Sequence, residues 1–484
     1  MRSPQAMSLI CSPILFSLIL PIYAVAGAPA GAGDTPIVVP LSRFLLPPRR
    51  DPLERLAGIA SASVLRAQLL KTPTTSLPSA RAPLSPHSYG GYSINVSLGT
   101  PPQEIPLLVD TGSQLTWIPC TKNYLCRNCS SPANPLAQIP TFLPKSSSTS
   151  KLIGCKNPKC GWIHSQEFLS HCRNCPSNSS DCPKICPPYL IIYGSGSTAG
   201  LLLSETLHFS SRTIADFVVG CSVFSQRQPA GGIAGFGRGT SSLPSQLGLK
   251  RFSYCLISRR FDDDPGESGS LVLNGLPDSS DGSIRFTPLV RNPISPPASA
   301  DAADGPSAFS VYYYIGLRKI TVGGKKVQIP YKALAPGADG NGGTIVDSGT
   351  TFTFMEPPVF EPVAAAFVAQ VAGRLNRSGE VEGLTGLKLC FELPEKAVEV
   401  SLPALVFHFK GGAEMQLPVE NYFVLVGSSR PSICLTVVSG GRAAGTVSRG
   451  PAIILGSFQQ QDFYMLYDLE RERLGFRQQS CIAK

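Results

Sequence analysis

Residues 107–113 read Leu107-Leu108-Val109-Asp110-Thr111-Gly112-Ser113, and residues 344–350 read Thr344-Ile345-Val346-Asp347-Ser348-Gly349-Thr350. Each stretch is an apolar run followed by an aspartate, a hydroxyl residue, a glycine and a second hydroxyl residue. An apolar run that ends in this way is typical of a buried strand that turns sharply at its end. A single aspartate at a strand end is often only a turn cap. Two copies indicate a duplicated lobe that brings two carboxylates, Asp110 and Asp347, together.

The neighbours of each aspartate can orient a carboxylate. Glycine permits a tight turn and exposes its backbone N–H, and hydroxyl groups can donate hydrogen bonds to a carboxylate oxygen. Two carboxylates held close together share one proton, so one of them can act as a base while the other acts as an acid. The expected supporting residues are Thr111, Gly112, Ser113, Ser348, Gly349 and Thr350.

Both motifs resemble the signature of the pepsin-like aspartic proteases. The resemblance runs from about Tyr92 to about Phe476 and is strongest for the plant nepenthesin-like branch, because a cysteine-rich region follows the first motif. It implies a mostly β, bilobal fold with two pseudo-symmetric β lobes and a central cleft. It also implies an aspartic-type endopeptidase, a hydrolase that cleaves peptide bonds at acidic pH by a water activated between Asp110 and Asp347. Such an enzyme needs no cofactor and no metal, and its expected partners are polypeptide substrates and pepstatin-type inhibitors.

Three further segments fit this resemblance. Residues 191–200 have two strand-like segments around a glycine-rich turn, which predicts a hairpin. By resemblance this hairpin is a flap in which Tyr193 and Gly194 cover bound peptide and the Tyr193 phenol meets Trp117. An ordinary hairpin with a core tyrosine is the alternative. Residues 232–235 and 452–456 resemble the apolar elements that thread beneath the two catalytic loops.

The N-terminal part of the chain is expected to be removed. Residues 1–26 carry Arg2, an apolar run and an Ala24-Val25-Ala26 pattern, which indicates a secretory signal peptide; a retained membrane anchor is the alternative. Residues 27–84 are basic and proline-rich, with a helix-compatible stretch from Asp51 to Leu70. By resemblance they are a propeptide that lies across the cleft and keeps a zymogen inactive. A disordered linker is the alternative.

The rest of the chain is expected to form the two lobes. Residues 85–250 would be an N-terminal β lobe with a cysteine-rich insert, the first aspartate and the flap. Residues 251–484 would be a C-terminal β lobe with the second aspartate. Gly 46 and Pro 45 with only 15% charged residues favour short strands and turns. The formal charge of +10 lies partly in the first 84 residues, so it indicates a solvated basic surface and no nucleic-acid partner.

The cysteine count favours disulfides. The chain has 15 cysteines, and loss of Cys11 with the signal peptide leaves an even number in an oxidising compartment. Zinc is the alternative, because two C-x-x-C pairs occur, although their separation exceeds the usual zinc-ribbon spacing. The family resemblance implies the bridges Cys255–Cys481 and Cys390–Cys434, whereas pairing in the first lobe stays open. The expected disulfide cysteines are Cys120, Cys126, Cys129, Cys155, Cys160, Cys172, Cys175, Cys182, Cys186, Cys221, Cys255, Cys390, Cys434 and Cys481.

These features predict a secreted monomeric glycoprotein with no stable membrane anchor, in the extracellular space or cell wall, with the vacuole as the alternative. Candidate glycosylation sites are Asn95, Asn128, Asn178 and Asn376.

A different function also fits the fold, because some plant relatives are non-catalytic and inhibit cell-wall glycosidases. Such relatives are expected to lack an aspartate or the flap tyrosine, and this chain has all three residues.

Overall fold

The computed structural model describes residues 37–43, 52–71, 91–129, 139–164, 169–170, 172, 184–193, 196–209, 212–258, 268–275, 283–293, 308–338, 340–394, 400–427, 431–440 and 450–482. The expected signal peptide, residues 1–26, lies outside these ranges, and so do Cys175, Asn178, Cys182 and Gly194. None of the helices in the described part of the chain combines the length and the apolar character that a membrane span requires.

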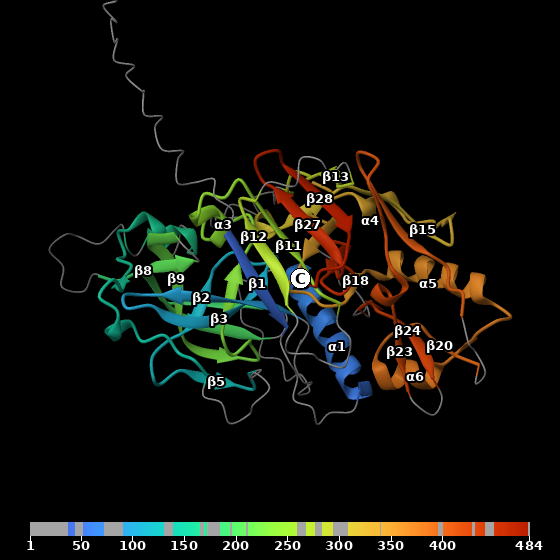
Figure 1. The fold of residues 1–484 in the computed structure, drawn as a ribbon, viewed down its shortest axis with the longest axis horizontal. Helices are drawn as coiled ribbons and strands as arrows, with labels where there is room; N and C mark the ends of the chain where they lie inside the picture. Colours follow the sequence, from blue (N-terminus) through green and yellow to red (C-terminus); the bar gives the residue numbers. More distant parts are fainter. Residues whose placement is uncertain are drawn as a thin grey trace, which may run out of the picture. The chain divides into compact units, whose positions relative to one another are not determined.

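Most strands of the N-terminal half, and several of the C-terminal half, share one 15-stranded sheet (Figure 1). Its order is β13 (Arg285–Pro288), β28 (Arg473–Gln478), β27 (Phe463–Asp468), β11 (Arg251–Cys255), β12 (Gly269–Leu273), β1 (Ile37–Arg43), β2 (Tyr92–Leu98), β3 (Gln103–Asp110), β10 (Ile233–Gly235), β4 (Trp117–Pro119), β9 (Arg212–Gln226), β8 (Ser197–Phe209) and β6 (Lys151–Leu152). Off this path, β5 (Leu125–Arg127) pairs with β9, and β7 (Tyr189–Ile192) pairs with β8.

Three smaller sheets belong to the C-terminal half. A five-stranded sheet has the order β14 (Tyr313–Ile315), β17 (Thr344–Asp347), β26 (Ile453–Gly456), β18 (Thr353–Met355) and β25 (Val437–Val438). A four-stranded sheet has the order β16 (Lys325–Lys326), β15 (Leu317–Val322), β21 (Leu405–Phe409) and β22 (Glu414–Gln416). The other has the order β19 (Asn376–Arg377), β20 (Cys390–Glu392), β24 (Ser432–Leu435) and β23 (Phe423–Val426).

Helices are few and mostly short among the described residues. The α-helices are α1 (Pro52–Lys71), α3 (Leu243–Gln246), α4 (Tyr331–Leu334), α5 (Pro357–Val371) and α6 (Gly379–Thr385). The 3-10 turns are η1 (Pro144–Ser146), η2 (Pro158–Trp162), η3 (Ala308–Val311) and η4 (Val419–Asn421). The predicted mostly β, bilobal architecture is confirmed.

The same three-strand arrangement surrounds both aspartates. β10 runs parallel to β3, with Gly235 opposite Asp110, and β26 runs parallel to β17, with Gly456 opposite Asp347. On its other side β10 is antiparallel to β4, and β26 is antiparallel to β18. Residues 232–235 and 452–456, which were expected beneath the two aspartate loops, therefore form strands that pair with the strands leading into those loops. Strands with neighbours on both sides hold the two loops in fixed positions.

The segment expected to be a propeptide contributes two ordered elements. Strand β1 pairs with β12 from Ile37 to Leu41 and with β2 at Ser42 and Arg43. The helix predicted over residues 51–70 is present as α1. Both elements are formed in the structure, and the propeptide role of residues 27–84 stays a prediction.

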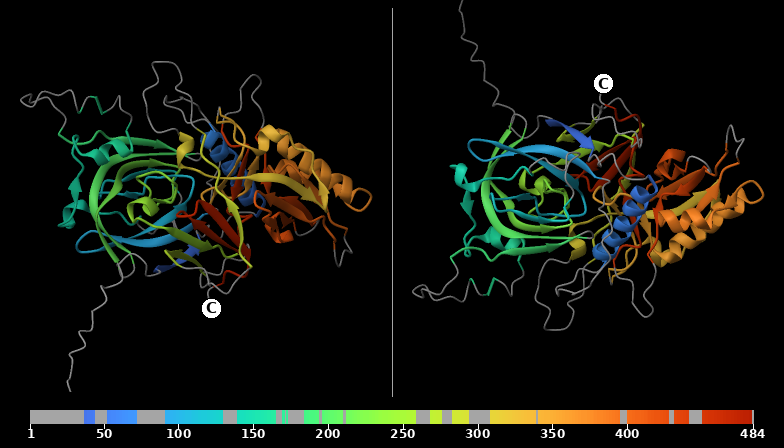
Figure 2. Two further views of the ribbon diagram at one scale, coloured as in Figure 1. Left: turned by 90° about the horizontal axis from the view of Figure 1, so that it is seen from above. Right: turned by 90° about the horizontal axis from the view of Figure 1, so that it is seen from below.

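Helix α1 packs as part of the core. Its Leu56, Ile59 and Ala67 are buried, and they recur at helical spacing on one face. They join a cluster that includes Phe352 and Phe354, close to the second aspartate loop. The helix contacts β18, β25 and α6, and both views of Figure 2 show it against elements of the C-terminal half. Apolar burial therefore holds α1 beside the second loop.

Six disulfides join the described cysteines, and both bridges implied by the resemblance are among them. Cys126 is bonded to Cys129, and Cys172 is bonded to Cys155. These cysteines of the two C-x-x-C pairs therefore have no free thiolate with which to bind zinc. Cys160 and Cys186 also come near His164 in a ligand-like group, but their two sulfurs are bonded to each other. The bridges are Cys120–Cys221, Cys126–Cys129, Cys155–Cys172, Cys160–Cys186, Cys255–Cys481 and Cys390–Cys434.

Alkylation of the unreduced, denatured protein is expected to modify none of these bridged cysteines, because a disulfide sulfur has no thiolate to react. Peptide mass spectrometry after alkylation measures this, and the same protein reduced first is the control. Stoichiometric alkylation of Cys255 or Cys390, or stoichiometric zinc in the native protein, would contradict the disulfide assignment.

Candidate active site

The two aspartate loops are joined by hydrogen bonds between their second residues. The Thr111 backbone N–H donates to Ser348 Oγ (3.1 Å), and the Ser348 N–H donates to Thr111 Oγ1 (2.9 Å). Each hydroxyl then donates to a carbonyl in the opposite strand, Thr111 to Val346 (3.3 Å) and Ser348 to Val109 (2.9 Å). All four groups are buried, where a lost hydrogen bond is costly. This reciprocal set holds the two loops face to face.

Each carboxylate is fully buried and held by its own loop. The Gly112 N–H donates to Asp110 Oδ1 and the Gly349 N–H donates to Asp347 Oδ1, both at 2.9 Å. The Thr350 hydroxyl donates to Asp347 Oδ2 at 2.5 Å. Ser113, which occupies the equivalent place in the first loop, is half-buried. The structure thus brings together all eight residues predicted from the two motifs.

The two glycines are required by close approach across the site. A Cβ atom built on Gly112 would lie 2.6 Å from Asp347 Oδ1, and one built on Gly349 would lie 2.8 Å from Arg66 Nη2. Contacts this short displace the opposite group. Glycine at both positions therefore lets the two carboxylates share one site.

Arg66 on α1 lies between the two carboxylates. Its Nη2 donates to Asp110 Oδ1 (2.6 Å) and to Asp347 Oδ1 (3.2 Å). Its Nε donates to Asp347 Oδ2 (2.8 Å) and to Thr350 Oγ1 (3.1 Å). The Arg66 side chain is 9% exposed, so Arg66, Asp110 and Asp347 form a buried ionic triad. Each charge in the triad has lost its contact with water and is stabilised by the opposite charges beside it.

Sequence analysis did not single out Arg66. The basic character of residues 27–84 was clear, but many lysines and arginines contribute to it. One signal was available, because Arg66 follows Ile59 and Ser63 at helical spacing on the face that becomes buried. A charge on the apolar face of an amphipathic helix needs a partner of opposite charge.

Burial and Arg66 act in opposite directions on the two carboxylates. Burial raises the pKa of Asp110, the guanidinium lowers it, and the charge of Asp347 raises it again, so that the net pKa is raised. Burial also raises the pKa of Asp347, but the guanidinium, Thr350 and Gly349 together outweigh burial and lower it. Burial lowers the pKa of Arg66, and the two carboxylates more than reverse this, so Arg66 stays charged. The pair is therefore asymmetric, with Asp347 the more readily ionised member.

The predicted hairpin is present beside the site. Ile192 of β7 pairs with Ser197 of β8, and the backbone closes between Tyr193 and Gly196. Trp117 Nε1 donates to Tyr193 Oη at 2.9 Å, and both side chains are buried. Burial, followed by the charge of Asp110, raises the pKa of Tyr193, so the phenol stays protonated. The tyrosine can therefore donate its own proton to a further group.

The described sequon asparagines all lie at the surface. Asn95 on β2 is exposed, and its side chain donates to Glu104 Oε1 at 2.6 Å. Asn128 and Asn376 are also exposed. Accessibility therefore permits glycosylation at these three sites, which stays a prediction.

The chain is similar to known proteins over most of its length. Family models described as xylanase inhibitor N-terminal and C-terminal domains match residues 92–274 and 312–478. A probable aspartyl protease of Arabidopsis thaliana is 32% identical over 437 residues, which covers 81% of this chain and 82% of that protein. The aspartic proteinase nepenthesin-2 of Nepenthes gracilis is 31% identical over 398 residues, covering 81% and 78%.

Solved structures support the fold. The chain resembles the crystal structure titled edgp, with a TM-score of 0.61, 20% identity and coverage of 92% of this chain and 95% of that one. It also resembles basic 7S globulin from soybean, with a TM-score of 0.58, 19% identity and coverage of 92% and 97%. Two duplicated loops facing each other across a bilobal β fold define the pepsin-like class. Within it, this chain belongs to the plant aspartic protease family that includes the nepenthesins.

Proposed function

We propose that the chain is the precursor of a secreted aspartic endopeptidase that hydrolyses peptide bonds at acidic pH. The observation that carries this proposal is the meeting of Asp110 and Asp347 in one buried site, with cross-bonded loops on both sides. Non-catalytic use of the fold would not need two carboxylates within reach of a single guanidinium.

The proposed reaction uses one shared proton. The ionised carboxylate takes a proton from a water molecule, which attacks the scissile carbonyl carbon, while the protonated carboxyl donates to the carbonyl oxygen. Proton transfer to the amine then releases the two peptides. The titration belongs to the pair, so turnover requires the singly protonated state and activity is bell-shaped with its maximum in acid. Tyr193 and Trp117 would close the hairpin over an extended peptide held by main-chain hydrogen bonds.

Arg66 and α1 would keep the precursor inactive at neutral pH. The guanidinium occupies the space between the carboxylates in which the water and the scissile bond must meet. Arg66 lowers the pKa of Asp347, so Asp347 has a lower pKa while α1 is docked than after α1 has been released. The ionic contact therefore stabilises the docked helix fully at pH values above the pKa of the released Asp347. This stabilisation is lost as the pH falls through the lower pKa that Asp347 has in the docked state. Acidification therefore favours release of α1.

Acid-dependent hydrolysis of a denatured protein, with and without pepstatin, tests the proposal. The secreted chain is brought to about pH 4, near ordinary carboxylate pKa values, and the products are followed by mass spectrometry. We expect new cleavages that pepstatin abolishes. Cleavage that pepstatin leaves unchanged, or none at any acidic pH, would contradict the proposal.

A glycosidase-inhibiting binding protein is the second candidate, because both matching family models are described as xylanase inhibitor domains. Addition of the Asp110→Asn form to a xylanase separates the two functions, since an inhibitor does not need the dyad. We expect no change in xylanase activity. Stoichiometric inhibition by the variant would favour the second candidate.

A further inference from the structure

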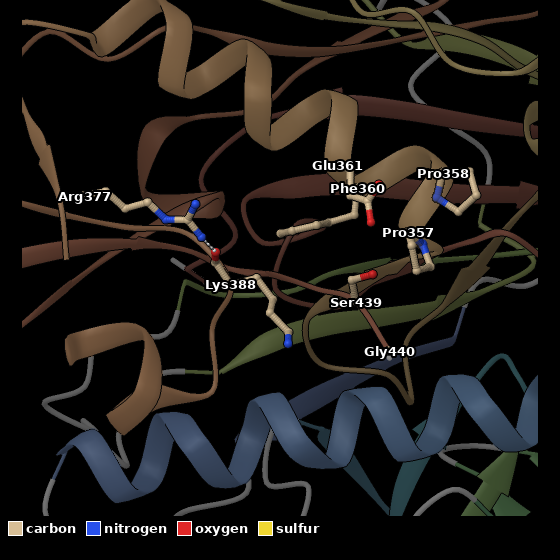
Figure 3. Close-up of a pocket in the computed structure, with 8 residues that line it drawn as sticks. All are labelled: Pro357, Pro358, Phe360, Glu361, Arg377, Lys388, Ser439 and Gly440. Carbon is tan, nitrogen blue, oxygen red and sulfur yellow. Dashed lines mark hydrogen bonds between the residues drawn. The ribbon is translucent and has the colours of Figure 1, made fainter. Parts of the chain in front are cut away.

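A cavity of about 590 Å³ lies in the C-terminal half beside α1 (Figure 3). We call it the Lys388 pocket. The first turn of α5 supplies an apolar wall, Pro357, Pro358 and Phe360. The residues that follow β25, Ser439 and Gly440, line another side.

The pocket is adjacent to the second aspartate loop. Strand β25 pairs with β18, which begins three residues after Thr350. A Cβ atom built on Gly440 would lie 3.5 Å from the Phe354 ring, 3.5 Å from Gln68 Nε2 and 3.7 Å from a Val64 methyl group. Gln68 and Val64 belong to α1, within a turn of Arg66. Helix α1 therefore lies against the Gly440 side of the pocket.

Two cations line the pocket, and among the described residues only Arg377 has a partner for its charge. Arg377 donates to both carboxylate oxygens of Glu382, at 2.6 and 3.0 Å, and to the Lys388 carbonyl at 2.9 Å. Lys388 is exposed, and its ammonium makes no ion pair or hydrogen bond with any described residue. In Figure 3 its side chain points away from Arg377, to the side of the pocket on which α1 is drawn. Glu361 is the acidic residue among the lining side chains.

We propose that the Lys388 pocket is a substrate subsite of the mature enzyme that takes an acidic side chain of the peptide. This inference rests on the proposed endopeptidase function. The apolar wall suits the methylene groups of a glutamate, and the Lys388 ammonium pairs with its carboxylate.

Peptides that differ at one position test the subsite. Glutamate, glutamine, lysine or cysteic acid, whose sulfonate stays charged in acid, is placed at each position within four residues of a fixed scissile bond. For the mature wild-type enzyme we expect kcat/KM to be about fivefold higher for glutamate and cysteic acid than for glutamine at one position, the scale of a partly exposed ion pair. Lys388→Glu is expected to reverse this preference towards lysine.

Lys326→Glu is the matched control, because Lys326 is exposed on β16, which does not line the pocket, and the substitution makes the same change of charge. It is expected to keep the wild-type preference. A circular dichroism spectrum of Lys388→Glu that matches the wild-type spectrum verifies that the variant is folded. The same preference in Lys388→Glu as in wild type would overturn the proposal.

A binding measurement separates this inference from the proposed function. The mature Asp110→Asn form is titrated with the same peptides, and fluorescence anisotropy gives the affinity without turnover. Tighter binding of the cysteic acid peptide supports the subsite even if the wild type hydrolyses nothing, which would overturn the function alone. Hydrolysis of every peptide with no charge preference would overturn the subsite and leave the function standing.

Discussion

Asp110→Asn and Asp347→Asn are each expected to lower the kcat of peptide hydrolysis by about 10³-fold or more, the scale for loss of a positioned acid or base. Asparagine has the volume of aspartate but can neither take the proton of the attacking water nor share one with its partner. The measurement is turnover of a fluorogenic peptide by the acid-treated chain. Loss in both variants is the central requirement of the shared-proton mechanism.

Asp216→Asn is the control for these two variants. Asp216 is exposed and has φ of +57°, a conformation that asparagine also adopts readily. It is expected to keep wild-type turnover, and circular dichroism should give the same spectrum for all three variants. Near-wild-type kcat in either dyad variant would refute the assignment of Asp110 and Asp347.

Arg66→Gln is expected to shorten the lag between acidification of the precursor and full activity by about tenfold. Removal of one member of a buried ionic group leaves the other charges uncompensated and destabilises the structure by several kcal/mol. Here the destabilised structure is the one in which α1 is docked on the two aspartates. Progress curves at a series of pH values from about 6 to about 3 measure the lag. The wild-type lag should shorten as the pH falls, because protonation of Asp347 removes the contact that Arg66 makes. In Arg66→Gln this pH dependence should largely disappear.

Arg66→Lys provides the matched comparison. Lysine keeps the charge but cannot place two N–H groups on two carboxylates in one plane. An intermediate lag that still shortens in acid is expected. If Arg66→Gln showed the wild-type lag and the wild-type pH dependence, apolar packing of α1 alone would account for latency.

The fold and the centre of the site could be predicted because both follow from local patterns that are repeated. The two aspartate motifs and the segments 232–235 and 452–456 carry the whole central arrangement, and the structure places Gly235 and Gly456 opposite the aspartates. The hydrogen bond between Trp117 and Tyr193 was also expected. Each of these features depends on a few residues whose chemistry is specific.

Features that depend on pairing between distant segments could not be predicted. Pairing of the first-lobe cysteines requires positions in space, which spacing does not supply. Strand β1 contains Pro40, and proline argues against an internal strand because it lacks an N–H. The structure accommodates it because β12 pairs with residues 37–41 while β2 pairs only with Ser42 and Arg43. Arg66 was hidden among similar residues, since only the docked helix shows which side chain reaches the dyad.

The position of β1 bears on how the protein could be made and stored. This strand lies between β12 and β2, so it completes a sheet that continues into both lobes. If residues 27–84 are cut away, a chain that later unfolds has no covalently attached strand to fill that place. The open edges of β12 and β2 would then invite pairing with other molecules. The activated enzyme would then stay folded because its rate of unfolding is low, and it would not refold once unfolded. The full-length precursor is the form from which active protein should be refolded.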